Sequence, residues 1–408
     1  MMVGVKGAEI IAAGASAADS LALTEIGAVL LLLGFIALFA SKIGFSSVPL
    51  FLLTGLLLGN GGLAPLHLSG DFLKVGAQFG AILLLLLLGL EYSARELGSA
   101  LRDRKSVGII DFAANAIPGA LFGLILGWGW TGALILGGIS YVSSSGIAAE
   151  LIRDSGLQRS EVAKRTIGVL VIEDLALAPY LPLASAVLSG VSALVGVISV
   201  SAAFIVVGLV LVISVRRESL VSGLLRHHDP LGLLLTVFGS ALLAAGAATY
   251  VGFSGVVAAF LVGLLLTGEV ANAARARLSP LRDIFAAIFF LFFGLTTDPR
   301  VIPSVLPIAI ALTLIGALGK FATGWWSSRD LSDPMSWRRT GALLIPRGEF
   351  SVVIAGLASA ASFGERLQAI TITYVILTTT LSSILIRFFR SRFAISRNTS
   401  RPASPNAI

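Results

Sequence analysis

Long, continuously apolar runs dominate the chain, and short charged or turn-rich segments separate them. We distinguish about thirteen runs, most of them near the 20 residues or so that span a bilayer as a helix. Because hydrophobic and polar positions do not alternate within the runs, they predict transmembrane α-helices rather than the strands of a barrel. The expected spans are 24–41, 47–66, 72–92, 107–127, 131–152, 166–188, 191–215, 230–249, 252–269, 282–297, 302–326, 339–362 and 367–388.

The composition supports an all-α, multi-pass membrane protein. Hydrophobic residues make up 56% of the 408 residues and charged residues only 12%, whereas a soluble protein carries about 25% charged residues. Such a chain needs lipid as its solvent. It contains no cysteine, which excludes disulfides and thiolate metal sites, and we expect no cofactor. The first residues lack a long apolar region with a cleavage site, so we interpret them as a mature N-terminus.

Basic residues lie mostly in alternate loops. Of the 29 Lys and Arg residues, 23 fall on one side of the predicted bundle, four on the other and two inside spans. Because positive residues favour the cytoplasmic side, we expect residues 1–23 outside and a disordered cytoplasmic tail over 389–408. The same bias explains the net charge of +7 without a nucleic-acid partner. The expected location is the inner (plasma) membrane of a bacterium.

Two apolar motifs early in the chain recur about 205 residues later. Gly55 in PLFLLTGLLLGN matches Gly263 in VVAAFLVGLLLTGE, and Gly89 in GAILLLLLLGLEYS matches Gly294 in FAAIFFLFFGLTTD. Seven spans separate the copies, so the repeats would cross the membrane in opposite orientations, as in secondary transporters. The predicted parts are repeat one over about 24–188, a linker helix over about 191–215 and repeat two over about 230–388.

Two spans contain residues that disfavour a continuous helix. The two sets are Ser143, Ser144, Ser145 and Gly146 in span five, and Pro346, Arg347, Gly348 and Glu349 in span twelve. Gly146 and Gly348 are 202 residues apart, so the sets occupy equivalent places in the repeats. We expect two interrupted, crossing helices, whose free carbonyls and dipole ends can coordinate ions. The alternative is small-residue packing of uninterrupted helices.

Five charged residues lie well inside the predicted spans, away from the span ends, where each costs about 3 kcal/mol. They are Glu173, Asp174, Lys320, Arg347 and Glu349. Neighbouring residues of a helix point about 100° apart, so one carboxylate of the Glu173–Asp174 pair can face a cavity while the other pairs with a cation. We expect Asp174 and Glu173 to form the ion- and proton-binding site, with Asp174 as the ligand of the transported Na⁺ or K⁺, without deciding which of the two pairs with Lys320. Alternatively the charges are structural, with Arg347 and Glu349 forming an ion pair.

Two weaker candidates lie in span four. Asp111 could line a cytoplasmic entrance, although its position near the helix end favours a side chain that reaches the interface. Asn115 precedes Lys320 by 205 residues and is therefore its expected counterpart in repeat one.

With these residues identified, the chain resembles the monovalent cation:proton antiporter-2 family, which includes bacterial potassium/proton and sodium/proton exchangers. The resemblance covers roughly residues 24–388. It is carried by VIEDLALAP at 171–179, the serines of span five, FFGLTTDP at 292–299, Lys320 and PRGEFSVV at 346–353, together with the glycine-rich runs.

The resemblance implies thirteen helices, a six-helix core domain that moves against a dimerisation domain, and a homodimer. It places the family's ion-site aspartate at Asp174, its core lysine at Lys320, and its crossover residues at 143–146 and 347–349. Many potassium-efflux members continue into a regulatory domain. Because this chain ends about 20 residues after its last span, we expect any such control from a separate cytoplasmic subunit.

The sequence therefore predicts a secondary active transporter that exchanges Na⁺ or K⁺ for H⁺ by alternating access, with both ions competing for Asp174. A sodium-coupled symporter of a small organic anion is one alternative, in which Arg347 binds the substrate within a larger polar cavity. A non-transporting membrane sensor is another, and it would tolerate Asp174→Asn. We expect no enzymatic activity, because the chain has no P-loop, no HExxH and no paired nucleophile and base.

Overall fold

The computed structural model describes residues 17–43, 45–59, 61–63, 70–91, 105–188, 230–250, 254–266 and 268–399. All regular secondary structure in these ranges is helical, which confirms the predicted fold class. The helices are α2 (Ala17–Ile43), α3 (Ser47–Leu58), α4 (Gly70–Glu91), α6 (Lys105–Ile125), α7 (Gly129–Tyr141), α8 (Ser145–Asp154), α9 (Glu161–Leu188), α12 (Pro230–Tyr250), α13 (Gly255–Leu265), α14 (Gly268–Leu295), η1 (Pro299–Val301), α15 (Ile302–Ser328), α16 (Ser336–Leu344), α17 (Glu349–Leu357) and α18 (Gly364–Thr399).

Ten segments of the described chain are long and apolar enough to cross a membrane. The interrupted pairs α7–α8 and α16–α17 each count as one segment among these ten, and the shorter apolar helices α3 and α13 add two more. These twelve correspond to twelve of the predicted spans. The expected linker helix over 191–215 lies outside the described residues, as does most of the N-terminal segment.

The last helix extends beyond its predicted end. We expected a disordered tail from residue 389, but the helical backbone of α18 continues to Thr399. Residues 389–399 contain neither glycine nor proline, the residues that most often end a helix. This part of the predicted tail is therefore helical.

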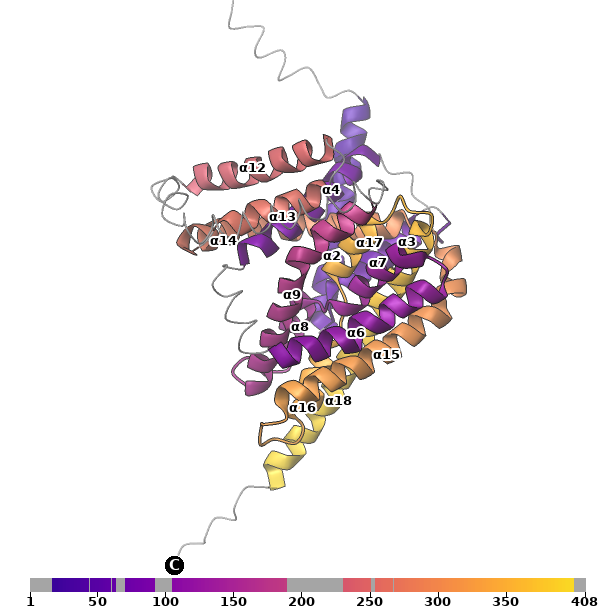
Figure 1. Cartoon of the computed structure of the whole chain (residues 1–408). Helices are drawn as coiled ribbons and strands as arrows, with labels where there is room; N and C mark the ends of the chain where they lie inside the picture. Colours follow the sequence, from indigo (N-terminus) through magenta and orange to yellow (C-terminus); the bar gives the residue numbers. More distant parts are fainter. Residues whose placement is uncertain are drawn as a thin grey trace, which may run out of the picture.

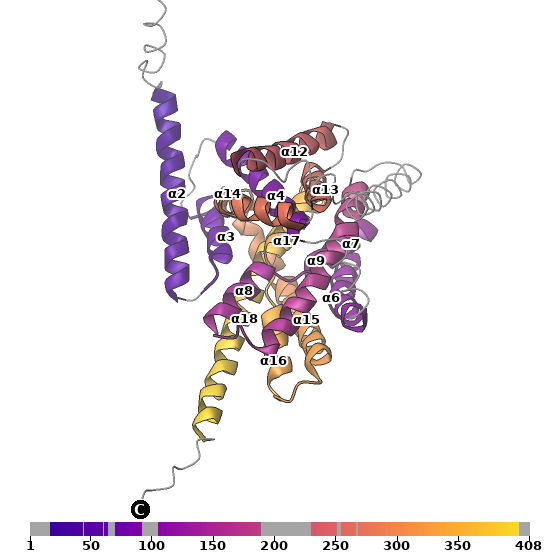
Figure 2. The ribbon, with the colours of Figure 1, turned by 90° about the vertical axis from the view of Figure 1, so that its left-hand side faces the viewer.

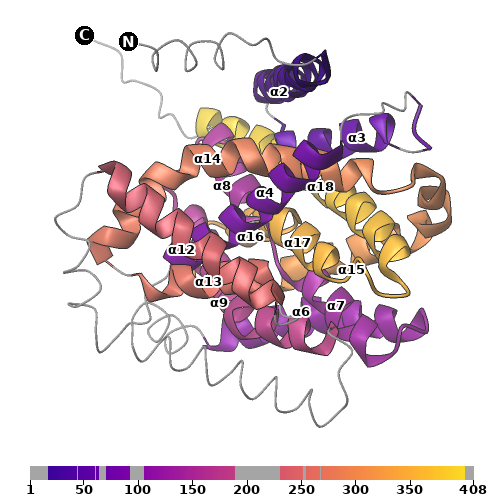
Figure 3. The same ribbon diagram turned by 90° about the horizontal axis from the view of Figure 1, so that it is seen from above.

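The helices pack as two groups (Figure 1). In the first group, called here the scaffold group, α4 contacts α13 and α14, while α3 packs on α14 and α12 on α13. In the second, called the crossing group, α6 packs on α7 and α15, α15 also packs on α16 and α18, and α9 packs on α16. Helix α2 stands at the edge of the scaffold group and packs on α3 (Figure 2). From above, the two groups lie side by side (Figure 3).

Glycines bring the scaffold helices into backbone contact. A Cβ on Gly55 would lie 2.7 Å from the Cα of Gly294, and a Cβ on Gly89 would lie 2.9 Å from the Cα of Gly263. Helices can approach this closely only where both residues lack side chains. The predicted repeats match Gly55 with Gly263 and Gly89 with Gly294. Exchanging each glycine for its counterpart in the other repeat turns the Gly55–Gly294 contact into the Gly263–Gly89 contact. A two-fold relation between the repeats requires this exchange.

We predict that Gly89→Ala destabilises the scaffold group, because the added methyl would lie 2.3 Å from the carbonyl oxygen of Phe260. Overpacking of this kind costs about 1–3 kcal/mol. Gly246→Ala on α12 is the control, since a Cβ there meets nothing within 4 Å. Thermal unfolding in detergent should show a lower midpoint for Gly89→Ala alone. Equal midpoints for the two variants would contradict the predicted contact.

Candidate functional site

Two short segments without helical structure cross in the middle of the crossing group. One joins α7 to α8 and the other joins α16 to α17, so both predicted interruptions are present. The amide of Ser144 donates to the carbonyl of Pro346 at 2.8 Å, and the Ser143 hydroxyl donates to the carbonyl of Leu344 at 2.6 Å. Ser144 and Pro346 are 202 residues apart, the offset of the predicted repeats, so the first bond joins equivalent positions.

Arg347 binds the C-terminal ends of the half-helices α7 and α16, which carry partial negative charge. Its buried guanidinium donates to the carbonyl of Ser140 in the last turn of α7, at 3.1 Å through Nε and 2.6 Å through Nη2. Nη1 donates to the carbonyls of Leu344 and Ile345 at the end of α16, at 3.1 and 2.9 Å. Carbonyls at a helix C-terminus carry partial negative charge. Arg347 therefore neutralises the ends of α7 and α16 together.

Glu349 has the complementary role at the N-terminal ends of α8 and α17, which carry partial positive charge. Its carboxylate accepts a hydrogen bond from the Ser144 hydroxyl at 2.6 Å and one from the Gly146 amide, in the first turn of α8, at 3.4 Å. Glu349 is itself the first residue of α17, and a negative charge is stabilised at a helix N-terminus. The expected Arg347–Glu349 ion pair is wrong, because each side chain binds a different pair of helix ends.

Lys320 forms the central ionic contact of the site. Its ammonium donates to Oδ1 of Asp111 at 2.9 Å, to the carbonyl of Tyr141 at 3.0 Å and to Oε1 of Glu173 at 3.1 Å. An ammonium has three hydrogens, and each has an acceptor here. Lys320 and both carboxylates are fully buried. This contact joins α15 to α6, α9 and the end of α7.

Glu173 is a carboxylate that pairs with Lys320. Its Oε2 also accepts a short hydrogen bond from the amide of Ser143, and its Oε1 lies 3.2 Å from the Ser143 hydroxyl. Glu173 is thus fixed between the lysine and the crossing. Asp174 follows on α9 and is 2% exposed.

Asp111 is part of the site rather than an interfacial side chain, so the expectation that it reaches the interface is wrong. It is 0% exposed, because α6 begins at Lys105 and thus places Asp111 about 9 Å along the helix. Besides Lys320, its Oδ1 accepts hydrogen bonds from Asn115 Nδ2 at 3.0 Å and from the Thr323 hydroxyl at 2.8 Å. The sequence analysis missed Thr323, although its spacing of three residues from Lys320 places both on one helix face.

The backbones of α6 and α15 approach closely beside this cluster. A Cβ on Gly319 would lie 2.6 Å from the carbonyl oxygen of Ala114. These residues are 205 residues apart, so they are equivalent in the predicted repeats. Asn115 and Lys320 follow them directly, which places the two expected counterparts at this contact.

The site contains more acidic than basic groups. The charged residues at and around the crossing are Asp111, Glu173, Asp174, Glu349, Lys320 and Arg347. Glu349 is partly exposed, so the buried groups are three acidic and two basic residues, with a formal charge of −3 + 2 = −1. Unbalanced charge is costly where the dielectric is low, so the arrangement favours binding of H⁺ or a cation. Within the described ranges no cluster of three or more His, Cys, Asp or Glu forms a metal site.

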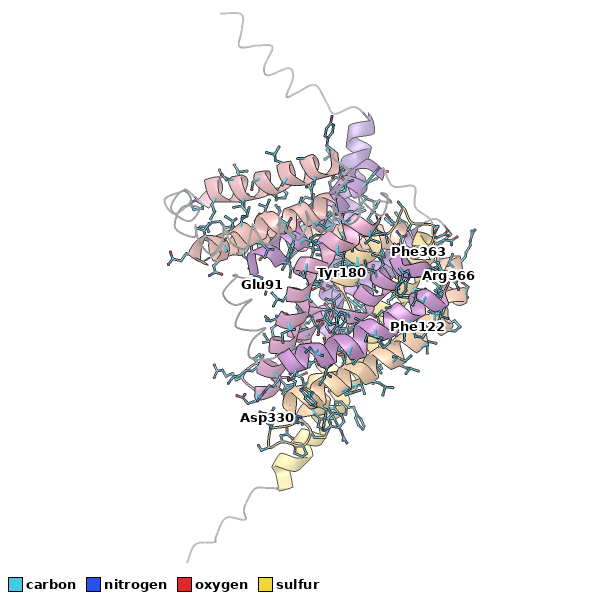
Figure 4. The ribbon with its side chains drawn as sticks, in the orientation of Figure 1. Glu91, Phe122, Tyr180, Asp330, Phe363 and Arg366 are labelled. Carbon is cyan, nitrogen blue, oxygen red and sulfur yellow. The ribbon has the colours of Figure 1, made fainter. Side chains whose placement is uncertain are left out.

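A cavity of about 490 Å³ lies between α6, α7 and α9. Apart from Tyr141 and Tyr180, its lining residues are apolar or glycine. The Tyr180 hydroxyl donates to the carbonyl of Leu134 on α7 at 3.2 Å. Tyr180 is partly buried and is labelled in Figure 4. Tyr141 connects the cavity to the site, because its ring centroid lies 5.5 Å from the Lys320 ammonium.

Comparisons with known proteins place this geometry in context. Residues 28–390 match the family described as "Sodium/hydrogen exchanger, transmembrane". The chain is 28% identical to the K(+)/H(+) antiporter subunit KhtU of Bacillus subtilis, with 89% of this chain and 92% of that protein covered. It is also 28% identical to the ammonium/H(+) antiporter subunit AmhT of Alkalihalophilus pseudofirmus, with 90% and 93% covered.

Other similarities cover part of a longer relative or concern the fold alone. The glutathione-regulated potassium-efflux system protein KefC of Klebsiella pneumoniae is 29% identical, with 82% of this chain but 55% of that protein covered. The sodium proton antiporter MjNhaP1 of Methanocaldococcus jannaschii aligns with a TM-score of 0.65 at 18% identity. That alignment covers 89% of this chain and 98% of the solved one, so the two share a fold.

We predict that Arg347→Lys destabilises the crossing, although it keeps the charge. A single ammonium cannot reproduce the fork that reaches both helix ends, and each buried carbonyl left without a donor costs about 1–3 kcal/mol. Arg275→Lys is the matched control, because the Arg275–Glu91 pair is more than a third exposed and such pairs contribute about 1 kcal/mol or less. Thermal unfolding in detergent would contradict the assignment if both variants unfolded at the wild-type temperature.

Proposed function

The chain belongs to the sodium/hydrogen exchanger family and is a cation/proton antiporter, and we propose that a monovalent cation and H⁺ compete for Asp174. The transporter would work by alternating access in the plasma membrane of a bacterium, with its N-terminus outside and its C-terminus in the cytoplasm.

The excess of buried negative charge is the observation that supports this proposal most strongly. Lys320 is shared by Asp111 and Glu173, and Arg347 and Glu349 bind helix ends. Asp174 is buried beside this network. A proton and a monovalent cation each bring one positive charge to the site, so either relieves the imbalance and binding of one opposes binding of the other.

The crossing supports the proposed coordination. Backbone carbonyls and serine hydroxyls of the α7–α8 and α16–α17 connections are hard oxygen ligands, which suit Na⁺ or K⁺. Because Arg347 and Glu349 neutralise the half-helix ends, the connections can remain non-helical inside the membrane. The crossing group would carry Asp174 between the two sides by moving against the scaffold group.

We further propose K⁺ as the favoured cation, with Na⁺ as the competitor. The first two relatives are named for K⁺ and ammonium, which are similar in size and larger than Na⁺. Both names also contain the word subunit, which supports control by a separate cytoplasmic protein. We also propose that the protein forms a homodimer whose interface lies on the scaffold group.

Neither alternative from the sequence is favoured by the structure. A symporter of an organic anion needs a polar cavity, whereas the cavity beside Tyr141 is lined mainly by apolar side chains. Arg347 is engaged by three carbonyls and would have to leave them to bind an anion. A sensor without transport would leave the pH gradient intact when K⁺ is added in the first experiment below.

In proteoliposomes with an imposed pH gradient, we expect added K⁺ to dissipate the gradient and Asp174→Asn to abolish this response. The amide keeps the shape of the side chain but cannot carry the exchanged charge. Asp283→Asn is the control, because Asp283 is 66% exposed on α14. A pH-sensitive dye inside the vesicles gives the rates, and parallel runs with NH₄⁺, Na⁺ and Li⁺ give the selectivity. If Asp174→Asn exchanged K⁺ for H⁺ at the wild-type rate, Asp174 would not be the site at which the cation and the proton compete.

Competition at one carboxylate also predicts how exchange depends on pH. In the pH range in which the empty site is mostly protonated, the apparent KM for the cation should rise about tenfold for each unit that the pH falls, by mass action. The rate at saturating cation should change much less over the same range. Initial rates over a matrix of cation concentration and pH test this, and a KM independent of pH would rule out a shared site.

A further inference from the structure

We propose that the apolar cavity between α6, α7 and α9 binds the hydrocarbon tail of a membrane lipid. Its volume is about 490 Å³, and ligand sites in proteins have volumes of roughly 300–1,000 Å³. The lining of the cavity does not include Asp174, and the proposal does not depend on the exchange proposed above. The ligand is a long acyl chain, and its source is the bilayer around the protein.

The lining of the cavity favours hydrocarbon. Its side chains are apolar or glycine except for Tyr141 and Tyr180, and the Tyr180 hydroxyl is bonded to the carbonyl of Leu134. A buried water needs about two to four polar partners, whereas apolar cavities bind apolar molecules. A polar or charged ligand would lose the hydrogen bonds that it makes in water. A lipid tail has no hydrogen bonds to lose.

Close contacts beside the cavity prevent the three helices from closing it. A Cβ on Gly119 of α6 would lie 2.6 Å from the carbonyl oxygen of Leu136 on α7, and the Tyr180 hydroxyl of α9 lies directly against Gly138 of α7. The helices therefore cannot approach further. Small residues leave the space between them, among them Ala116, Ala120, Ala133 and Gly137.

The cavity opens toward the lipid. Phe112 and Ile117 of α6 line it and are 54% and 48% exposed, and the exposed Pro179 of α9 lines it as well. Both helices are long and apolar enough to cross a membrane, so residues exposed along them contact acyl chains. Ile109 and Leu121, 69% and 52% exposed, continue this apolar surface along α6.

The position of the three helices agrees with an opening to the bilayer. Seen from above, α6, α7 and α9 lie at one edge of the described helices, away from α2 and α3 (Figure 3). The cavity is therefore continuous with the surface through which α6 contacts lipid, and a tail can enter it sideways from the membrane.

The depth of the cavity admits the tail of a lipid rather than its headgroup. On α6 the cavity is lined by residues between 112 and 120, and the helix covers Lys105–Ile125. At 1.5 Å per residue, the lining begins about 10 Å from one end of α6 and stops about 7 Å from the other. A span of this length ends near the headgroups, so both limits of the lining lie among acyl chains.

A bound tail supports the first half of the interrupted helix α7. This half-helix lines the cavity between residues 133 and 141, and it ends at Tyr141, directly before the connection that takes part in the crossing. Packing of hydrocarbon on Gly137 and Tyr141 adds dispersion contacts on this side of α7. The lipid thereby stabilises the position of α7 against α6 and α9.

Labelling from within the bilayer tests the proposal. The protein is reconstituted into vesicles of phosphatidylethanolamine and phosphatidylglycerol, with a phosphatidylcholine that carries a diazirine at the end of one acyl chain. After illumination, mass spectrometry locates the adducts. We expect adducts on Tyr141 and Leu177, which line the cavity and are 6% and 1% exposed. Leu318 on α15, 70% exposed, reports ordinary contact with lipid and should be labelled in every sample.

A matched pair of variants on α6 completes the design. Ala120→Phe fills the cavity, because Ala120 lines it, and should lose the adducts on Tyr141 and Leu177. Ala113→Phe is the control, since Ala113 is exposed on the same helix and does not line the cavity, and it should keep them. Wild type labelled at Leu318 but not at the buried lining would overturn the proposal, even if Ala120→Phe does not fold. Unchanged adducts in a folded Ala120→Phe would also overturn it.

The other candidate occupant is the predicted linker helix over 191–215, which lies outside the described residues. The chain contains no cysteine, so Ala120→Cys can be paired with single cysteines introduced along 191–215. A disulfide forms only where the two Cβ atoms come within about 4.5 Å of each other. We expect no cross-link on oxidation in membranes. Efficient cross-linking would show that the linker helix fills the cavity and would overturn the proposal.

Discussion

The contact of one buried ammonium with two carboxylates organises the site. Lipid cannot solvate a charge, so the Lys320 ammonium needs partners inside the protein. Asp111 and Glu173 supply them from α6 and α9, and the last carbonyl of α7 supplies a third acceptor. The lysine thus ties half of the crossing group together. Asp174 is buried beside this contact, and we propose that it binds the exchanged ion.

The same electrostatic constraint explains the crossing. Two helices interrupted inside a membrane expose two negative and two positive ends, which would be unstable without partners. Arg347 binds the carbonyls at both negative ends. Glu349, in the first turn of α17, accepts hydrogen bonds from Ser144 and Gly146 at the start of α8. The two charged side chains at the crossing, Arg347 and Glu349, are therefore already hydrogen-bonded to the helix ends there. The proposed exchange at Asp174 would therefore not require the connections to unfold.

The sequence was sufficient to predict features that depend on local composition. The spans follow from runs of apolar residues, and the interruptions at Ser144 and Gly348 follow from serine, glycine and proline within such runs. The pairing inside the bundle was not predictable, because it depends on the rotation and depth of each helix. The burial of Asp111 and the choice of Glu173 by Lys320 are set by close contacts such as that of Gly319 with Ala114. These contacts join residues that are far apart in the chain.

Proton release on cation binding tests the central claim most directly. Detergent-solubilised protein in weakly buffered solution can be titrated with K⁺ while the pH is recorded and binding is followed by calorimetry. Competition at Asp174 predicts that each bound cation displaces one proton, and that both signals disappear in Asp174→Asn. Cation binding to the wild type with no release of protons would contradict the account.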